Sequence, residues 1–222
     1  MKSELKFTDG RSLELGSIFC IGQNYARHAR EMGSRVSEAP TVFLKPPQSY
    51  LPEGGKIWLP DFSNNIHYEV ELVVVVGEEC VDVSPGDALG RVAGYAVGID
   101  VTLRDVQAAA KKEGAPWTTA KGFRTSGAIS QVVPAAAVEL PDDLSLELNI
   151  NGKLAQSGST CEMERGVSEL ISYISRVFGL RAGDVIFTGT PEGVGKIPPA
   201  AELEARLLTT RRELIVSARW LS

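Results

Sequence analysis

The segment at residues 67–77 limits the fold of this chain more than any other. It includes four consecutive valines, and because β-branched residues are stiff and form helices poorly, it predicts a buried strand. Successive side chains of a strand alternate between its two faces, so Glu69 and Glu71 should point the same way. Two carboxylates therefore stand close together at the entrance of an otherwise apolar strand.

These two like charges predict a cation site. Burial of either carboxylate costs several kcal/mol unless a positive group lies between them, and a hard divalent cation with oxygen ligands is the simplest such group. Asp100 is a third candidate ligand, because it ends the next predicted strand, residues 92–100. Two alternatives stay open: Glu69 and Glu71 lie solvated at an exposed strand end, and Asp100 is only a cap before Thr102.

Three carboxylates around one ion would also need further cations nearby. An octahedral Mg²⁺ or Mn²⁺ would keep about three positions for a chelating substrate and a water molecule, with a net charge of about −1. Lys121, in a turn next to Gly122, and Arg104, on a predicted helix, could then attract an anionic substrate. The alternative is that both are surface cations among the 23 lysines and arginines of the chain.

A second polar pair lies near the N-terminus. His28 and Glu31 are close neighbours on one face of a helix predicted at residues 25–32. A carboxylate beside an imidazole fixes its tautomer and raises its basicity, which suits a general base that deprotonates water. The chain has only two histidines, and the other, His67, flanks a strand, where a histidine usually bonds the backbone. The alternative is that His28 and Glu31 form an exposed polar pair.

The turn at residues 188–195 resembles an anion-binding loop. Its sequence, Thr-Gly-Thr-Pro-Glu-Gly-Val-Gly, offers backbone amides and hydroxyls that could point at a ligand. It lacks the lysine of a Walker loop, and no strand is followed by G-x-G-x-x-G, so a nucleotide cofactor is not supported. The absence of G-x-S-x-G argues against a serine hydrolase.

Composition excludes several other classes of function. The net charge of −5 and the lack of a basic patch argue against nucleic acid and anionic membranes as partners. No apolar run approaches the length of a spanning helix, and the first ten residues lack the apolar core of a signal peptide. Three widely spaced cysteines without a C-x-x-C pair argue for a reducing compartment. We therefore expect a cytoplasmic protein.

The chain predicts a β-rich α+β fold. Hydrophobic periodicity and turn signals indicate roughly ten short strands and three helices, without regular alternation of the two. Asp9-Gly10 and Asn151-Gly152 predict hairpin turns, and Gly179 is expected to end a helix at residues 167–178. We predict one catalytic domain over residues 1–222, in which residues 1–16 form a strand or hairpin extension.

Together, these stretches resemble the fumarylacetoacetate hydrolase family. The resemblance extends from about residue 17 to 196, in the order of the family motifs. Lys-Lys-Glu-Gly-Ala-Pro-Trp at 111–117 is similar to the short, single-domain acylpyruvase and oxaloacetate decarboxylase branch. The matching stretches are Ile-Gly-Gln-Asn-Tyr at 21–25 with His28 and Glu31, Phe-Leu-Lys-Pro at 43–46, His-Tyr-Glu-Val-Glu-Leu at 67–72, residues 94–100, Thr-Leu-Arg-Asp-Val-Gln at 102–107, Lys-Gly-Phe at 121–123, Asn-Gly at 151–152 and residues 183–191.

The resemblance implies a role for each matched position. It implies a mixed β-sandwich roll of the family's C-terminal domain type, usually a homodimer. The implied roles are Mg²⁺ or Mn²⁺ ligation by Glu69, Glu71 and Asp100, water activation by His28 and Glu31 on a lid segment, a lysine beside the metal at Lys121, and substrate contacts at Arg104, Gln107, Thr190 and, more peripherally, Lys45. Two departures from the family pattern, at residues 126–128 and 164–166, could alter the pocket without changing the metal chemistry.

This reasoning predicts a Mg²⁺- or Mn²⁺-dependent hydrolase that cleaves a C–C bond in acylpyruvates such as acetylpyruvate or fumarylpyruvate. The products would be pyruvate and a carboxylic acid. One alternative is an oxaloacetate decarboxylase or keto–enol tautomerase, because all three reactions pass through the same type of enolate. Another alternative is a catalytically silent, metal-dependent binder of small dicarboxylates.

Overall fold

A mixed β-sheet forms the centre of the molecule in the computed structural model, which describes residues 3–222. Its strands are β3 (Ile18–Gly22), β4 (Thr41–Lys45), β5 (Tyr50–Pro52), β7 (Val70–Val76), β8 (Val92–Asp100), β10 (Gly127–Ile129), β11 (Val133–Pro134) and β14 (Val185–Phe187). Their order is β4-β3-β14-β7-β8-β10-β5, and β11 pairs with β8. The pairs β3–β14 and β5–β10 are parallel, and the other pairs are antiparallel.

Strand β7 lies in the middle of this sheet and is buried along its whole length, as the run of valines predicted. Leu72 and Val74 face one hydrophobic cluster, whereas Val73 and Val75 face another. The sheet is therefore covered on both faces. Because side chains alternate along the strand, Glu71 lies on the same face as Val73.

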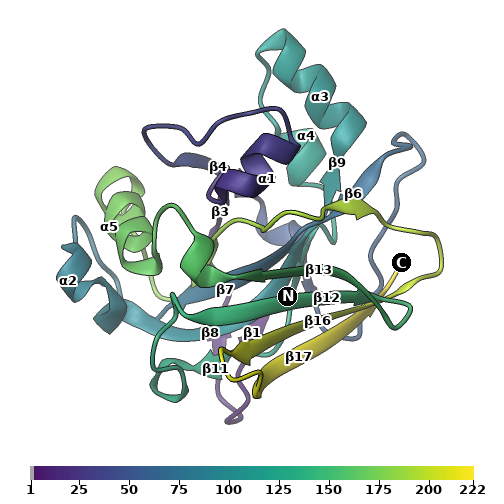
Figure 1. The fold of residues 1–222 in the computed structure, drawn as a ribbon. Helices are drawn as coiled ribbons and strands as arrows, with labels where there is room; N and C mark the ends of the chain where they lie inside the picture. Colours follow the sequence, from purple (N-terminus) through teal and green to yellow (C-terminus); the bar gives the residue numbers. More distant parts are fainter. Residues whose placement is uncertain (1–2) are drawn as a thin grey trace.

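A second sheet packs against one face of the first, so the fold has the layers of a sandwich (Figure 1). Its strands are β12 (Leu144–Ile150), β13 (Lys153–Ser159), β16 (Glu202–Thr209) and β17 (Leu214–Leu221), in the order β13-β12-β16-β17. Leu146 and Leu207 belong to the same hydrophobic cluster as Leu72. Asn151 and Gly152 join β12 to β13 with positive φ angles of 51° and 74°, which confirms the predicted hairpin.

The N-terminal hairpin covers the other face of the main sheet. Strands β1 (Glu4–Lys6) and β2 (Ser12–Glu14) pair antiparallel, as the Asp9-Gly10 turn predicted. Leu5 and Phe7 pack in the second hydrophobic cluster together with Val73. The hairpin is therefore part of the apolar packing of the sheet.

The helices lie at the periphery of the sheets. They are α1 (Ala26–Glu31), α2 (Pro85–Ala88), α3 (Arg104–Glu113), α4 (Thr118–Lys121) and α5 (Val167–Phe178), with 3₁₀ turns η1 (Pro47–Ser49), η2 (Leu89–Arg91), η3 (Ala135–Ala137) and η4 (Thr160–Glu162). In Figure 1, α1, α3 and α4 gather at the upper end, and α2 and α5 lie together at one side. Among residues 3–222, no helix combines the length and apolar character needed to span a membrane.

The main difference from the predicted strand pattern is a break at Glu69. The expected continuous strand is split into β6 (Ile66–Tyr68) and β7, and β6 joins a small sheet with β9 (Thr102–Leu103) and β15 (Gly195–Lys196). Thr102 is thus in a strand, and the helix predicted to carry Arg104 is α3, which starts at Arg104 itself. The break puts Glu69 at the junction of two sheets, where its carbonyl accepts a hydrogen bond from the Asp100 amide.

Residues 3–222 form 17 strands and five α-helices, more than the sequence predicted. The additional strands are only two or three residues long. Strands of two or three residues are too short to show an alternating pattern. Their hydrogen-bond partners come from other parts of the chain, so the local sequence does not predict them. The predicted β-rich α+β class is nevertheless confirmed.

Candidate active site

The three predicted acidic ligands converge at one end of the main sheet. Glu69 precedes β7, Glu71 lies on β7, and Asp100 ends the antiparallel neighbour β8, whose register brings it beside Glu69. One oxygen from each carboxylate lies within 4.8 Å of the other two. Their exposed fractions are only 4%, 2% and 1%, respectively, which excludes a solvated strand end.

Three buried cations surround these carboxylates. Lys121 Nζ, at the end of α4, donates hydrogen bonds of 2.7 Å to both Glu69 Oε2 and Asp100 Oδ2. Lys45 Nζ lies 2.7 Å from Asp100 Oδ1, and the Arg104 guanidinium binds Glu69 Oε1. Lys121 and Arg104 are therefore not surface cations, and Asp100 is more than a cap at the end of a strand.

The carboxylates differ in their electrostatic surroundings. Burial favours the neutral form of Glu69, but the positive charges of Arg104 and Lys121 outweigh it and lower the pKa of this carboxyl below its ordinary value. Within residues 3–222, no lysine or arginine forms an ion pair with Glu71, and its carboxylate accepts a hydrogen bond of 2.7 Å from the Gly189 amide. Burial, followed by the charges of Asp100 and Glu69, raises its pKa well above the ordinary value.

The donor set fits a hard divalent cation. All three ligands are carboxylates, and an ion between them would relieve the repulsion that raises the pKa of Glu71. Asp100 Oδ1 accepts no hydrogen bond from residues 3–222, although Lys45 Nζ lies 2.7 Å away, so this buried oxygen has lone pairs that could ligate an ion. Mg²⁺ or Mn²⁺ would keep about three octahedral positions for other ligands.

The loop at residues 188–195 supports these groups from behind. The Gly189 amide binds Glu71, and the hydroxyls of Thr188 and Thr190 donate to the carbonyls of Leu72 and Val70. These three groups are thus used by the protein's own carboxylate and strand, whereas the sequence suggested that they point at a ligand.

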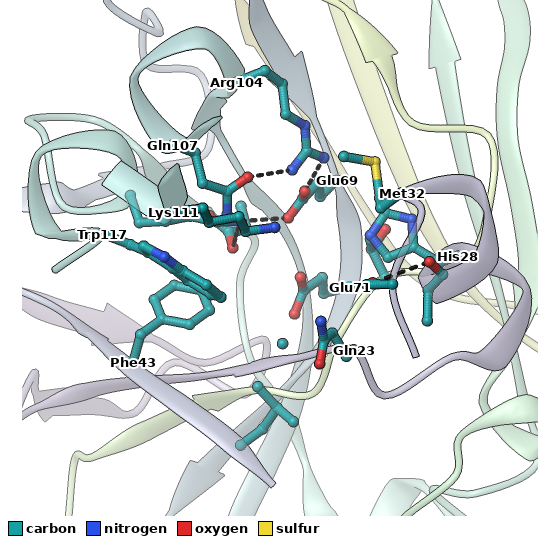
Figure 2. A pocket seen from close by; sticks show the side chains of 17 residues that line it. Gln23, His28, Met32, Phe43, Glu69, Glu71, Arg104, Gln107, Lys111 and Trp117 are labelled. Atoms are coloured by element: carbon teal, nitrogen blue, oxygen red, sulfur yellow. Dashed lines mark hydrogen bonds and ion pairs between the residues drawn. The ribbon is translucent and has the colours of Figure 1, made fainter. Parts of the chain in front are cut away.

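His28, on α1, lines the same cavity as the three carboxylates (Figure 2), and Glu31 follows it by three residues on the same helix. His28 Nδ1 is 3.2 Å from Glu31 Oε2, and the Gly193 amide donates to both oxygens of Glu31 at 3.3 Å. His28 is 9% exposed, so it is not the freely solvated partner of an exposed pair. An ionised carboxylate only accepts hydrogen bonds, so this contact suits the neutral tautomer that carries its proton on Nδ1, in which Nε2 would be an acceptor.

The predicted substrate residues fall in two places. Arg104, Gln107 and Thr190 line the cavity, and Arg104 Nη1 donates to Gln107 Oε1 at 3.0 Å (Figure 2). Lys45 lies behind Asp100 and outside the cavity lining, where its amine also binds Ser126 Oγ and the Lys121 carbonyl. Lys45 is thus placed to support the site from outside the cavity.

Several residues without a predicted role also line the cavity. They include Gln23, Met32, Phe43, Lys111 and Trp117. Lys111 could have been found from spacing alone, because it follows Arg104 and Gln107 on the same face of α3. Gln23 has a φ of 62°, a left-handed conformation that is not apparent from the sequence.

The two departures from the family pattern have structural roles beside the cavity. The Ser126 hydroxyl donates to the Lys121 carbonyl and accepts from Lys45. The Arg165 guanidinium donates to the carbonyls of Ser37 at 2.7 Å and Glu38 at 2.5 Å, in the segment that follows α1. Ser126 therefore helps to position Lys45 and Lys121, and Arg165 holds the loop that follows α1.

Comparison with known proteins gives a consistent result. Residues 17–217 match the family model for the fumarylacetoacetate (FAA) hydrolase C-terminal domain. The chain is 45% identical to the mitochondrial oxaloacetate tautomerase FAHD1 of Bos taurus over 189 residues, which are 85% of this chain and 86% of that protein. It is 47% identical to the Arabidopsis thaliana protein of the same name over 188 residues, 85% of this chain and 84% of that protein.

A solved structure extends the similarity to nearly the whole chain. It is that of fumarylpyruvate hydrolase from Pseudomonas aeruginosa in complex with Mn²⁺ and pyruvate, with a TM-score of 0.91 and 33% identity over 99% of this chain and 95% of that chain. The family model, the relatives and the shared fold together lead to one conclusion. The chain belongs to the fumarylacetoacetate hydrolase family.

Proposed function

We propose that this protein is a metal-dependent oxaloacetate keto–enol tautomerase. The observation that carries the proposal is the buried group of Glu69, Glu71 and Asp100, with Lys121 and Arg104 beside it. Such a site suits a small anion that presents a carboxylate and a neighbouring keto oxygen. The named oxaloacetate tautomerases resemble this chain more than the fumarylpyruvate hydrolase does, so we place tautomerisation ahead of the hydrolysis predicted from the sequence.

A divalent ion, two cationic side chains and one base would perform the reaction. A divalent ion held by the three carboxylates would supply Lewis acidity toward the keto oxygen. The Arg104 guanidinium would hold the substrate carboxylate, and the Lys121 ammonium would stabilise the negative charge that develops on the enolate oxygen. His28 Nε2 would take the proton from C3 and return it to the enolate oxygen, while Glu31 stabilises the imidazolium.

A second candidate activity is C–C hydrolysis of acylpyruvates. The observation that favours it is the contact of His28 with Glu31, which is a suitable base for activating water. Water attack on the distal carbonyl would release a carboxylic acid and the enolate of pyruvate. Decarboxylation of oxaloacetate would form the same enolate by loss of CO₂ and would need no water attack.

A substrate panel tests the proposal. Purified protein with Mg²⁺ or Mn²⁺ would be assayed for decay of the enol absorbance of oxaloacetate, and for pyruvate release from oxaloacetate and acetylpyruvate. We expect EDTA to abolish activity and added metal to restore it. Turnover that is independent of metal, or no turnover of any 2-oxo acid, would contradict the proposal. Tight binding of oxalate without any turnover would identify a binding protein instead.

We also propose that the protein forms a homodimer. Leu44, on the edge strand β4, is 46% exposed and lies between two surface grooves of about 660 and 690 Å³ that both include it. Phe178, 51% exposed, lines the second groove. Exposed apolar side chains that gather on one face, such as Leu44 and Phe178, can mark an interaction site. Light scattering should report a dimer that Leu44→Lys dissociates, whereas Leu154→Lys, on β13, should not.

The cytoplasmic location stays a proposal. Cys20, Cys80 and Cys161 are all free, which fits a reducing compartment. The similar oxaloacetate tautomerases are named as mitochondrial proteins, so fractionation of source cells is the direct test. Recovery in an organelle fraction would contradict a cytoplasmic location.

A further inference from the structure

Lys111 lies at the mouth of the active-site cavity and has no role in the reaction as proposed above. On α3 it follows Gln107 by one helical turn and Arg104 by two, so the three side chains share one helix face. Figure 2 shows the Lys111 side chain extending from α3 across the cavity, above the rings of Trp117 and Phe43. The side chain is therefore in position to touch a ligand that fills the cavity.

The ammonium group of Lys111 forms no ion pair with any acidic side chain that the structure describes. Within residues 3–222 it makes no hydrogen bond or ion pair, and its recorded contact is with the Trp117 ring, whose centroid lies 5.0 Å from Nζ. Desolvation, followed by the positive charges of Arg104 and Lys121, lowers the pKa of Lys111, and the negative charge of Glu69 opposes this shift without reversing it. A cation that faces other cations across a cavity is suited to an anionic ligand, since the ligand relieves the repulsion.

The charges around the cavity indicate what this ligand carries. Three carboxylates and three cationic side chains meet at the site, so their charges cancel. They are Glu69, Glu71 and Asp100 on one side and Lys45, Lys121 and Arg104 on the other. A bound divalent ion would then leave a net charge of two positive units. Lys111 and Glu31 cancel each other in this count. A substrate with one carboxylate neutralises half of the excess, and a second carboxylate neutralises the rest.

We propose that Lys111 binds a second carboxylate at the far end of the substrate. It would thereby select 2-oxo dicarboxylates over 2-oxo acids that end in an apolar group. This inference rests on the proposed function, because it assumes that the head of the substrate lies at the three carboxylates and Arg104. Without Lys111, the wall formed by Phe43 and Trp117 would favour an apolar end instead.

Malate and lactate provide a direct test by binding. They share a 2-hydroxy acid head and differ in the far carboxylate of malate, and neither has a keto group that could be tautomerised. Calorimetry with Mg²⁺ present should show that the wild type binds malate ~10- to 100-fold more tightly than lactate, the range of one charge-assisted hydrogen bond. Lys111→Met should bind both within about threefold, with its lactate affinity unchanged.

Kinetics provide a second readout. In Lys111→Met, KM for oxaloacetate should rise ~10- to 100-fold while kcat changes little, because the lost contact is far from the reacting carbon. Lys111→Arg keeps the positive charge and should keep most of the preference for malate. Lys112→Met is the matched control, since Lys112 is exposed and lies outside the cavity lining. This variant should keep the wild-type affinities for malate and lactate and the wild-type KM for oxaloacetate.

The outcomes separate this inference from the proposed function. If oxaloacetate is turned over but Lys111→Met keeps the full preference for malate, the role of Lys111 is wrong and the function stands. The same holds if Lys111→Arg loses the preference as completely as Lys111→Met does. If the wild type binds no 2-oxo or 2-hydroxy acid and turns over none, the proposed function fails as well.

Discussion

Each acidic side chain of the site has different partners, and Glu71 is the one that makes no ion pair in the part of the chain that the structure describes. Glu69 contacts Arg104 and Lys121, whereas Glu71 has only the Gly189 amide. A buried carboxyl in this position holds its proton at pH values where an ordinary glutamate is ionised. A bound divalent ion would therefore have to displace a proton from Glu71.

Metal binding should consequently release a proton and become tighter as pH rises. The raised pKa of Glu71 sets the sign, because below that pKa the proton competes with the ion for the carboxylate. Calorimetric titration of metal in buffers with different ionisation enthalpies measures the release directly. Glu71→Gln should remove it and weaken metal binding. Uptake of a proton, or an affinity independent of pH, would contradict this account.

His28→Ala should separate the reactions that need a base from the one that does not. We expect acylpyruvate hydrolysis and oxaloacetate tautomerisation to fall by ~10²- to 10⁴-fold, the usual contribution of general acid–base catalysis, and decarboxylation to fall much less. His67→Ala serves as the control, because His67 lies outside the cavity lining and bonds Asn65. Equal loss in all three reactions would show that His28 is not the base.

At the level of elements, the site depends on the loop that follows β14. Gly189 has a φ of 102°, and a Cβ added there would lie 2.9 Å from Asn24 Cβ. The Asn24 amide in turn donates to the carbonyls of Thr188 and Arg165. This packing holds the Gly189 amide against Glu71, so the loop transmits any distortion to the metal ligand.

Gly189→Ala should therefore damage both stability and metal binding. The left-handed backbone and the close contact with Asn24 predict a loss of ~1–3 kcal/mol in the free energy of unfolding. Metal affinity should fall in the same variant, because the amide moves away from Glu71. Gly90→Ala is the control, since no atom lies within 4 Å of a Cβ there. Thermal denaturation and metal titration of both variants would measure this, and unchanged metal affinity in Gly189→Ala would refute the link.

At the scale of the whole molecule, a cluster of buried charges closes one end of an apolar sheet. Both hydrophobic clusters contain residues of β7, and the acidic group lies at the start of that strand. Three buried carboxylates close together favour any state in which a cation separates them. The ion should thus stabilise the fold as well as serve the reaction.

Removal of metal should lower the thermal stability of the protein. An ion that binds only the folded state, and is present at a concentration about 100 times its Kd, adds ~2.7 kcal/mol to the free energy of unfolding. We expect Mg²⁺ or Mn²⁺ to raise Tm relative to EDTA, and Asp100→Asn to lose most of this shift. Sodium chloride at equal ionic strength controls for screening. An identical Tm with EDTA and with metal would argue against binding at the three carboxylates.

The sequence by itself determined the elements that depend on local rules. The strand at 92–100, the helix at 167–178 and both hairpin turns follow from hydrophobic patterning, helical spacing and turn residues. The same local rules predicted that Glu69 and Glu71 lie close together, and that His28 and Glu31 share a helix face. The end of the next strand and the charge balance added Asp100, Lys121 and Arg104 as candidates, and family resemblance then added Gln107, Thr190 and Lys45.

Only the tertiary structure decided which of these groups meet and what they contact. The register of β7 with β8 brings Asp100 to Glu69, and the Gly189 amide reaches Glu71 from 118 residues away. The break at Glu69 and the place of Lys45 behind Asp100 likewise depend on strands paired across the chain. The physical reason is that burial and electrostatic pairing arise from contacts between distant segments, and no local pattern encodes them.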